Sequence, residues 1–136
     1  MSGIPLHISE TLQSRIGLVP AFIAAVMGKL CFLPFEQKAS FDIKLALQEA
    51  VINAMKHGNK LNAALVVKVD IQAQERQLTI EVTDQGPGFD YTSIPNPILP
   101  ENLEKMSGRG IFLIQNAMDH VEFEDHGRTI RMTKNF

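Results

Sequence analysis

The stretch LQEAVINAMKHGN, residues 47–59, decides the fold. At 100° per residue it separates into two sides of a helix. The apolar side holds Leu47, Ala50, Val51 and Ala54, together with Ile43 one turn earlier, and the polar side holds Glu49, Asn53, Lys56 and His57. The pair Gly58-Asn59 is a helix stop signal. The pattern therefore predicts an amphipathic helix over residues 40–57, with Ser40 as its N-cap.

The polar side of this helix has two interpretations. The simpler interpretation is a solvated helix face. The other is a phosphoryl-transfer face, because Glu49 and Asn53 lie one turn apart, about 6 Å along the axis. Asn53 offers a neutral oxygen suited to Mg²⁺ that carries substrate phosphates. Glu49 offers a carboxylate that can take a proton from an attacking hydroxyl. Lys56 and His57 could contact phosphate, although both residue types are common on surfaces.

A second motif follows a predicted strand, where residues 78–83 run into DQGPGFD, residues 84–90. An acidic residue followed by Gly-x-Gly is also typical of an ordinary turn. In the functional reading, the glycines Gly86 and Gly88 let a ligand approach the backbone closely. Asp84 then accepts a hydrogen bond from an exocyclic amine. A carboxylate in that place favours adenine and repels the guanine carbonyl, so it would select ATP over GTP.

A third motif, SGRGIFLI at residues 107–114, places two glycines immediately before an apolar helix. Backbone amides at a helix start form an anion site, and Arg109 adds a charge that can pair with a terminal phosphate. A flexible hinge with a solvated arginine is the alternative. Leu113 stands where a third glycine would complete Gly-x-Gly-x-x-Gly, and no Walker A motif occurs, so the pattern fits neither a Rossmann domain nor a P-loop protein.

The rest of the chain supplies a layer of helices and a sheet. Alternating Val- and Ile-rich stretches predict strands, and capped apolar stretches predict helices. The expected strands are 4–8, 65–74, 77–84, 120–124 and 129–134; the expected helices are 9–33, with Ser9 as N-cap and a kink at Pro20, then 40–57 and 110–118. A hairpin turn is expected at Glu75-Arg76 and a long loop over residues 85–107. This order predicts one α+β domain spanning residues 1–136, a two-layer sandwich of helices over a mostly antiparallel mixed sheet.

Composition and charge exclude several classes of protein. Fifteen acidic and thirteen basic residues give a formal charge of −2, whereas a dedicated nucleic-acid binder normally carries a basic face. The N-terminus lacks the pattern of a signal peptide, and the longest apolar stretch, residues 16–33, is too interrupted to span a bilayer. The single cysteine, Cys31, lies in an apolar stretch and is expected to pack in the core. A cytoplasmic protein is the resulting expectation.

The three motifs, in this order and spacing, resemble the N, G1 and G2 boxes of the GHKL ATPase superfamily, with its Bergerat ATP-binding fold. The resemblance covers residues 40–136. Within the superfamily the chain most resembles the anti-sigma-factor serine/threonine protein kinases of bacteria. The points of likeness are residues 49–59, 108–114, 118–121 and 129–134. His120 stands where that family commonly has glutamate, at a position expected near the sheet surface.

The resemblance implies roles for individual residues. Glu49 would be the general base that activates an acceptor serine, and Asn53 would hold Mg²⁺. Asp84 would bind the adenine amine and Thr129 would lie near the adenine. The glycines of the second and third motifs would shape the nucleotide pocket and border the phosphates, with Arg109 beside them; they are Gly86, Gly88, Gly108 and Gly110. Residues 91–107 would form a lid over ATP.

The resemblance also implies partners. A kinase of this family uses ATP and Mg²⁺ to phosphorylate an anti-anti-sigma protein, and it sequesters a sigma factor. A homodimer is implied as well. One alternative is a catalytically silent, ATP-dependent anti-sigma or protein-binding module, which would tolerate the loss of Glu49. Another is a histidine-kinase catalytic domain detached from its phosphoacceptor, although no second helical hairpin with an acceptor histidine is evident.

Overall fold

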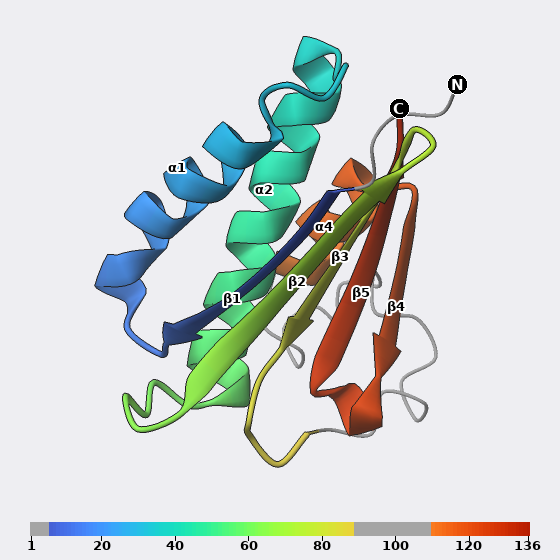
Figure 1. Cartoon of the computed structure of the whole chain (residues 1–136). Helices are drawn as coiled ribbons and strands as arrows, with labels where there is room; N and C mark the ends of the chain where they lie inside the picture. Colours follow the sequence, from blue (N-terminus) through green and yellow to red (C-terminus); the bar gives the residue numbers. More distant parts are fainter. Residues whose placement is uncertain (1–5, 89–109) are drawn as a thin grey trace.

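A five-stranded antiparallel sheet carries a layer of helices on one face (Figure 1). This computed structural model describes residues 6–88 and 110–136. The strand order is β1-β2-β3-β5-β4. The strands are β1 (Leu6–Gln13), β2 (Val66–Gln74), β3 (Gln77–Thr83), β4 (His120–Glu124) and β5 (Thr129–Asn135). The helices are η1 (Ile16–Leu18), α1 (Val19–Leu30), α2 (Gln37–Asn53), η2 (Ala54–Gly58), α4 (Gly110–Ala117) and η4 (Asp125–Gly127). The α+β two-layer prediction is confirmed.

The sheet forms because most residues of its strands alternate between apolar and polar. One set of side chains is buried under the helices, namely Val67, Val69, Ile71 and Ala73 of β2, Leu78, Ile80 and Val82 of β3, and Ile130 and Met132 of β5. Their sequence neighbours point to the open face. The predicted hairpin between β2 and β3 is confirmed, with Glu75 and Arg76 at φ 52° and 68°. Two consecutive residues with positive φ match the twist of the flanking strands.

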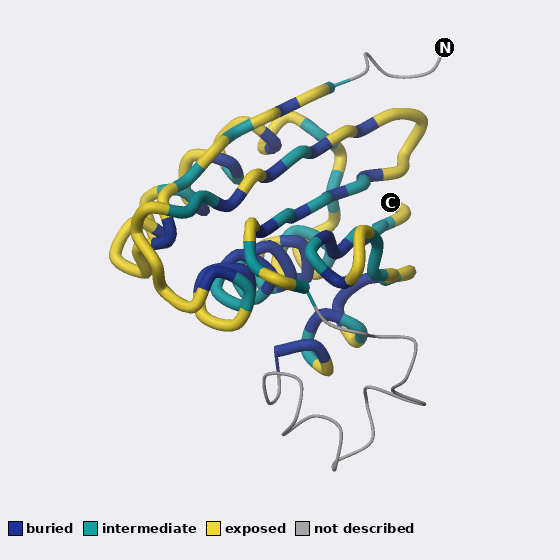
Figure 2. The backbone as a smooth tube through the Cα atoms, turned by 90° about the horizontal axis from the view of Figure 1, so that it is seen from below, coloured by how far each residue is buried: buried dark blue, intermediate teal, exposed yellow. Residues whose placement is uncertain are grey.

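The helix α2 lies in the middle of the helix layer, between α1 and α4 (Figure 1). Its buried side is the apolar side expected from the sequence, including Ile43, Leu47, Ala50 and Val51. Figure 2 shows the buried residues gathered where the helices and the sheet face each other. After Asn53 the helix widens into η2, a turn of π-helix in which the backbone N–H of Asn59 donates to the carbonyl of Ala54 at 2.8 Å. The stop at Gly58-Asn59 is confirmed, and π-turns often accompany functional sites.

The predicted helix start at Ser9 is wrong. Ser9 lies within β1, paired with Asp70 of β2, and α1 begins ten residues later at Val19. The short alternation of Leu6, Ile8 and Leu12 is a strand signal, and the pairing with β2 satisfies the backbone groups of this segment. Pro20 lies in the first turn of α1, where a missing N–H has no cost, so it does not kink the helix.

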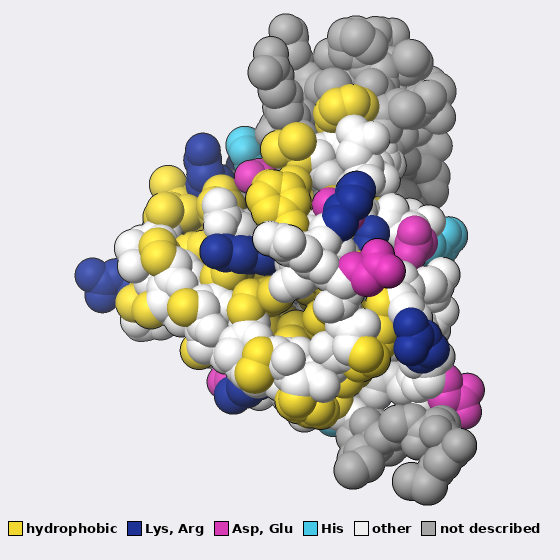
Figure 3. All heavy atoms as spheres, turned by 90° about the horizontal axis from the view of Figure 1, so that it is seen from above, with side chains coloured by type: hydrophobic (Ala, Val, Ile, Leu, Met, Phe, Trp, Pro, Cys, Tyr) yellow, Lys and Arg dark blue, Asp and Glu magenta, His cyan; other side chains and the backbone are white. Residues whose placement is uncertain are grey.

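Two further expectations about individual residues fail. Ser40 lies inside α2, which begins three residues earlier at Gln37 after Glu36. Cys31 is exposed rather than buried, and it lies at the C-cap of α1, just after the last helical residue, Leu30. Phe32 is also exposed, and Figure 3, which views this end of the molecule, shows apolar side chains open to solvent among charged ones.

The expectation for His120 is confirmed, since its side chain is exposed on β4. Most of the long loop expected over residues 85–107 lies outside the described residues, which include only its first part, up to Gly88. Within the described residues, no helix combines the length and the apolar character needed to cross a bilayer.

Candidate functional site

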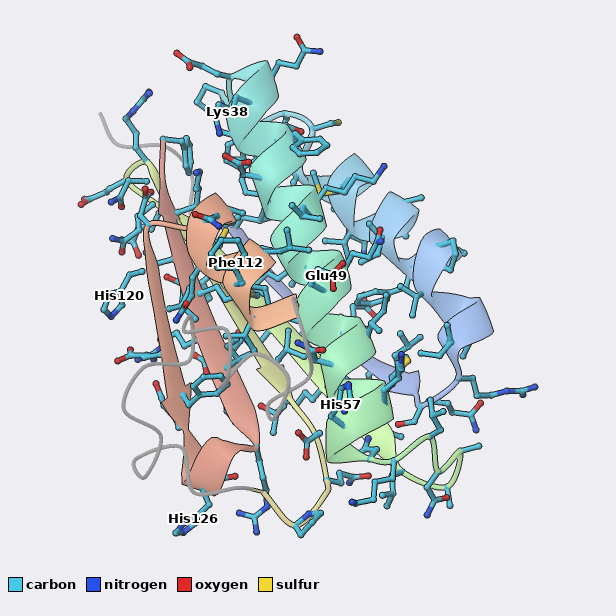
Figure 4. All side chains as sticks on the ribbon, turned by 180° about the vertical axis from the view of Figure 1, so that it is seen from behind. Lys38, Glu49, His57, Phe112, His120 and His126 are labelled. Atoms are coloured by element: carbon cyan, nitrogen blue, oxygen red, sulfur yellow. The ribbon has the colours of Figure 1, made fainter. Side chains whose placement is uncertain are left out.

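The end of α2, the loop after β3, the start of α4 and the turn η4 converge at one end of the molecule. In Figure 4, His57 of η2 and His126 of η4 both lie toward this end. The contacts are made by glycines. A Cβ atom on Gly58 would overlap the carboxyl group of Asp84, and one on Gly86 would overlap the carbonyl oxygen of Gly58. The helix end and the loop are thus in direct backbone contact, which no other residue type would permit.

Asp84 occupies the centre of this contact. It is buried, its backbone N–H donates to the Arg128 carbonyl at 2.9 Å, and its Oδ1 accepts from the Gly86 N–H at 2.8 Å. Its Oδ2 faces Gly58. Burial raises the pKa of Asp84, and the Gly86 hydrogen bond and the Arg128 charge offset part of that rise. The carboxyl group of Asp84 is therefore a buried hydrogen-bond acceptor at the start of the loop that contains Gly86 and Gly88.

The loop continues against the turn between β4 and β5. Gly88 has φ +79°, a conformation that favours glycine, and a Cβ on it would overlap the carbonyl oxygen of His126. His126 itself has a positive φ of 56°, as does Asp125 at 51°. The structure thus brings Gly86 and Gly88, both predicted from the sequence, against two separate elements.

Two residues that hold this loop were not predicted from the sequence. Asn59 is 2% exposed, its Nδ2 donates to the Ser14 Oγ at 2.7 Å and to the Val66 carbonyl at 2.9 Å, and its Oδ1 accepts from the Gln85 N–H at 2.7 Å. Arg128 donates from its side chain to the Gly86 carbonyl at 2.9 Å. The sequence marks Asn59 as part of a helix stop signal and of the first motif, but not as a support of the loop, and it holds no local signal for Arg128.

Asn53 and Glu49 lie on successive turns at the end of α2, as predicted. Asn53 faces α4, where a Cβ on Gly110 would stand 2.9 Å from its Nδ2 and 3.1 Å from its Oδ1. Its Nδ2 is buried and has no hydrogen-bond partner among the described residues. Such an unpaired buried group is unusual in a native protein, where buried polar atoms nearly always have a hydrogen-bond partner. Glu49 is half-buried and lies on the face of α2 seen in Figure 4.

His57 follows on η2 and is exposed. Partial burial, together with the charges of Lys56 and Lys60, lowers its pKa below the usual value. Lys56 is exposed as well. The side chains of Lys56 and His57 therefore lie at the solvent-exposed rim of the site.

Thr129 opens β5 and is buried beside the Asp84 loop. Its hydroxyl group is 2.9 Å from that of Thr83, its partner across the β3–β5 pair. Thr129 therefore lies beside the end of β3, the strand that leads into Asp84. Gly108 and Arg109 of the third motif and the lid expected over residues 91–107 lie outside the described residues.

An α+β sandwich in which a central helix end meets two glycine motifs defines a class of nucleotide-binding domains. Residues 10–134 match the family model described as "Histidine kinase-like ATPase domain". The chain belongs to this family, as the resemblance to the GHKL superfamily predicted, and ATP is the nucleotide that the family implies.

The chain is also similar to proteins named "Serine-protein kinase RsbW" from Staphylococcus aureus, among them those of strains JH9, Newman and USA300. Each is 37% identical to this chain over an alignment of 101 residues, and the match covers 68% of this chain and 64% of the relative. The matched region therefore spans just under two thirds of these relatives. The likeness agrees with the resemblance to anti-sigma-factor serine kinases.

Proposed function

We propose that the chain is an ATP-dependent serine/threonine protein kinase that phosphorylates an anti-anti-sigma protein and sequesters a sigma factor. One observation carries the proposal: Glu49 and Asn53 stand on successive turns of α2, at the point where the helix end meets the glycine loop and the start of α4. The relatives named serine-protein kinases support the same reaction.

The residues present fit ATP and Mg²⁺. Asn53 has an amide whose buried Nδ2 has no partner among the described residues, and it lies beside the start of α4. Mg²⁺ typically takes one or two protein oxygens and completes its octahedron with phosphate oxygens and water. Asn53 Oδ1 would be such a protein ligand. The amides at the start of α4, together with Gly108, Arg109 and Gly110, would border the phosphates.

The opposite end of the nucleotide would lie at the Asp84 loop. The carboxylate of Asp84 would accept a hydrogen bond from the adenine amine, with Gly86 and Gly88 leaving room for the ring and Thr129 beside it. Guanine carries a carbonyl at that position, so its binding would bring two acceptors together. His57 on the rim would lie near the phosphates.

Glu49 would act on the acceptor protein. Its carboxylate would take the proton of a serine hydroxyl as the hydroxyl oxygen attacks the terminal phosphorus of ATP and the bond to ADP breaks. Bound Mg²⁺ would neutralise the charge that develops on the phosphate oxygens. Phe112 of α4 is 39% exposed and lies level with Glu49 in Figure 4. We expect the acceptor serine to approach Glu49 from this outer face of the helix layer.

A homodimer through α1 is the second part of the proposal. The outward side of α1 carries small and apolar residues, since Ala21, Ala24 and Ala25 are all exposed. Ile16 and Leu18 of η1 are exposed beside it. Ala24→Glu should convert a dimer into a monomer in sedimentation analysis, with an unchanged circular dichroism spectrum. A wild-type protein that sediments as a monomer at micromolar concentration contradicts the dimer.

The first experiment is calorimetric titration of the purified protein with ATP, ADP and GTP, each with and without Mg²⁺. Selective, Mg²⁺-dependent binding of adenine nucleotides is the expected result. Incubation with radiolabelled ATP and a purified anti-anti-sigma protein should then label a serine or threonine of that protein. Binding without transfer would support the silent binding module, and no binding would contradict the nucleotide site altogether.

A further inference from the structure

Arg128 connects the turn η4 to the loop that follows β3. Its Nε donates to the Gly86 carbonyl at 2.9 Å and its Nη2 to the Pro87 carbonyl at 3.3 Å. Its Nη1 lies 3.3 Å from the Asp125 carbonyl oxygen and 3.5 Å from the Asp125 Oδ1. One guanidinium group thus bonds two successive carbonyls of the loop and is itself held by the turn.

The backbone of Arg128 holds the same two segments together. Its carbonyl accepts from the Asp84 N–H at 2.9 Å, and its own N–H donates to the Asp125 carbonyl at 3.0 Å. Arg128 therefore fixes both ends of the short segment from Asp84 to Pro87.

The other side of the segment is fixed by a different residue. Asn59 accepts from the Gln85 N–H at 2.7 Å, and the side chain of Gln85 in turn accepts from the Val66 N–H at 2.7 Å. Gly86 lies close to the Gly58 carbonyl oxygen and Gly88 close to that of His126, so the loop packs against backbone on two sides. The Gly86 and Pro87 carbonyls of the same loop accept hydrogen bonds from Arg128.

The charge of Arg128 matters as well, because Asp84 is buried. The charged groups that act on Asp84 are Arg128, which favours the carboxylate, and Asp125, which disfavours it. Both come from the η4 side, while η2 presents the backbone of Gly58. Without the guanidinium, burial and Asp125 together would push the pKa of Asp84 further up.

We propose that Arg128 is a positioning residue for adenine recognition, which fixes the Gly86–Pro87 backbone by its two-pronged hydrogen bonding and supplies the counter-charge for Asp84. This inference rests on the proposed function, because it assigns adenine to the Asp84 loop. It predicts that lysine cannot replace Arg128, because an ammonium group is a point charge and lacks the planar fork that reaches two carbonyls. Charge and geometry are therefore separable by substitution.

The first test uses the nucleotide-free protein and three variants. Arg128→Gln removes the charge and the fork, Arg128→Lys removes the fork alone, and Arg131→Gln removes a guanidinium from the sheet face, where it is paired with Glu81, Glu122 and Glu124. Nuclear magnetic resonance follows the titration of the Asp84 carboxyl and the hydrogen exchange of the Gly86 amide. Arg128→Gln should raise the Asp84 pKa and speed the exchange. Arg128→Lys should speed the exchange alone, and Arg131→Gln should change neither.

The second test is the affinity for Mg²⁺-ATP as a function of pH. Arg128→Gln should weaken binding about tenfold or more, as expected for lost hydrogen bonds from a charged group, and the affinity should begin to fall at a higher pH than in the wild type. Unchanged Asp84 titration and Gly86 exchange in Arg128→Gln would overturn the proposal, as would an equal loss of affinity at every pH. If wild-type protein binds no ATP, the proposed function fails, and the nucleotide-free measurements still decide whether Arg128 positions the loop.

Discussion

Gly110 and Asn53 face each other across the contact between α4 and α2, and there is no room between them for a methyl group. A Cβ on Gly110 would lie 2.9 Å from the Asn53 Nδ2 and 3.1 Å from its Oδ1. The glycine thus leaves room for the amide of Asn53 at the start of α4. The Nδ2 of that amide is buried and has no partner among the described residues.

Gly110→Ala tests this relationship. The added methyl group should displace the Asn53 side chain while the helix itself tolerates alanine well. We expect the protein to fold and to bind Mg²⁺-ATP about tenfold or more weakly, because a hydrogen bond or ligand bond to a charged group is lost. Gly28→Ala on α1 is the matched control, since nothing lies within 4 Å of its added Cβ. It should leave affinity unchanged and raise stability by up to about 1 kcal/mol. Equal affinity in both variants contradicts a role for the Asn53 amide.

Asn53→Ala should remove the effect of Mg²⁺ on ATP binding. The alanine variant keeps the helix but loses the side-chain oxygen proposed as the metal ligand, so calorimetry with and without Mg²⁺ should give the same affinity. Asn53→Asp restores an oxygen in the same position and should restore a response to Mg²⁺. If Asn53→Ala shows the wild-type response to Mg²⁺, the metal ligand lies elsewhere.

The sequence predicted α2, the hairpin and the two glycine motifs because each depends on local patterns. The apolar side of α2 and the alternation of β2 are visible within a dozen residues, and the turn at Glu75-Arg76 follows from the strands that flank it. The predicted strand over residues 4–8 ended too early, because the alternation over Leu6–Gln13 is interrupted by Glu10 on the helix side and joins a helix-rich stretch. Only the pairing with β2 selects a strand there.

The supporting residues of the site could not be predicted for a related reason. Asn59 reaches Ser14 and Gln85, which are 45 and 26 residues away along the chain. Arg128 reaches Gly86 across 42 residues. Side chains that connect distant segments leave no periodic pattern in the sequence, so the sequence predicted the groups proposed to touch the nucleotide and missed those that hold them.

Asp84→Asn tests adenine recognition through pH. Because burial raises the pKa of Asp84, the carboxylate should become protonated at a higher pH than an ordinary aspartate. A protonated carboxyl loses acceptor capacity, so ATP affinity of the wild type should fall as the pH is lowered through that pKa. The asparagine variant should show no such fall, and its preference for ATP over GTP should drop by about 1–3 kcal/mol, the cost of an unsatisfied buried polar group. Wild-type protein that binds both nucleotides equally contradicts the assignment.

Asp42 and Lys134 link α2 to β5 and should contribute to stability in a pH-dependent way. Burial alone would raise the pKa of Asp42, but hydrogen bonds from Lys38 at 3.0 Å and Lys134 at 3.2 Å, with their charges, lower it below the usual value. An aspartate with a lowered pKa in the folded state stabilises the protein above its unfolded-state pKa, and this stabilisation disappears as the pH falls through the folded-state value.

Asp42→Asn should therefore unfold more easily than the wild type at neutral pH, by about 1–3 kcal/mol, and the difference should shrink with acidification below the ordinary aspartate range. Urea unfolding at a series of pH values measures it. Asp70→Asn on the open sheet face, where the Asp70 carboxylate meets a largely exposed His7, is the control and should change stability by less than about 1 kcal/mol at neutral pH. A constant difference between wild type and Asp42→Asn at every pH contradicts the ionised pair.

Glu49→Gln separates nucleotide binding from phosphoryl transfer. Glutamine keeps the size and the helix propensity of the residue but cannot take a proton, so Mg²⁺-ATP should bind with wild-type affinity while transfer to the acceptor protein falls by about 10²–10⁴-fold. Gln48→Ala is the control, because Gln48 is a half-buried polar neighbour on the same helix; both binding and transfer should stay close to wild type. Phosphorylation of the acceptor by Glu49→Gln at the wild-type rate would show that another group, or the substrate itself, removes the serine proton. A loss of ATP binding in the same variant would place Glu49 among the nucleotide contacts, rather than on the acceptor side of the reaction.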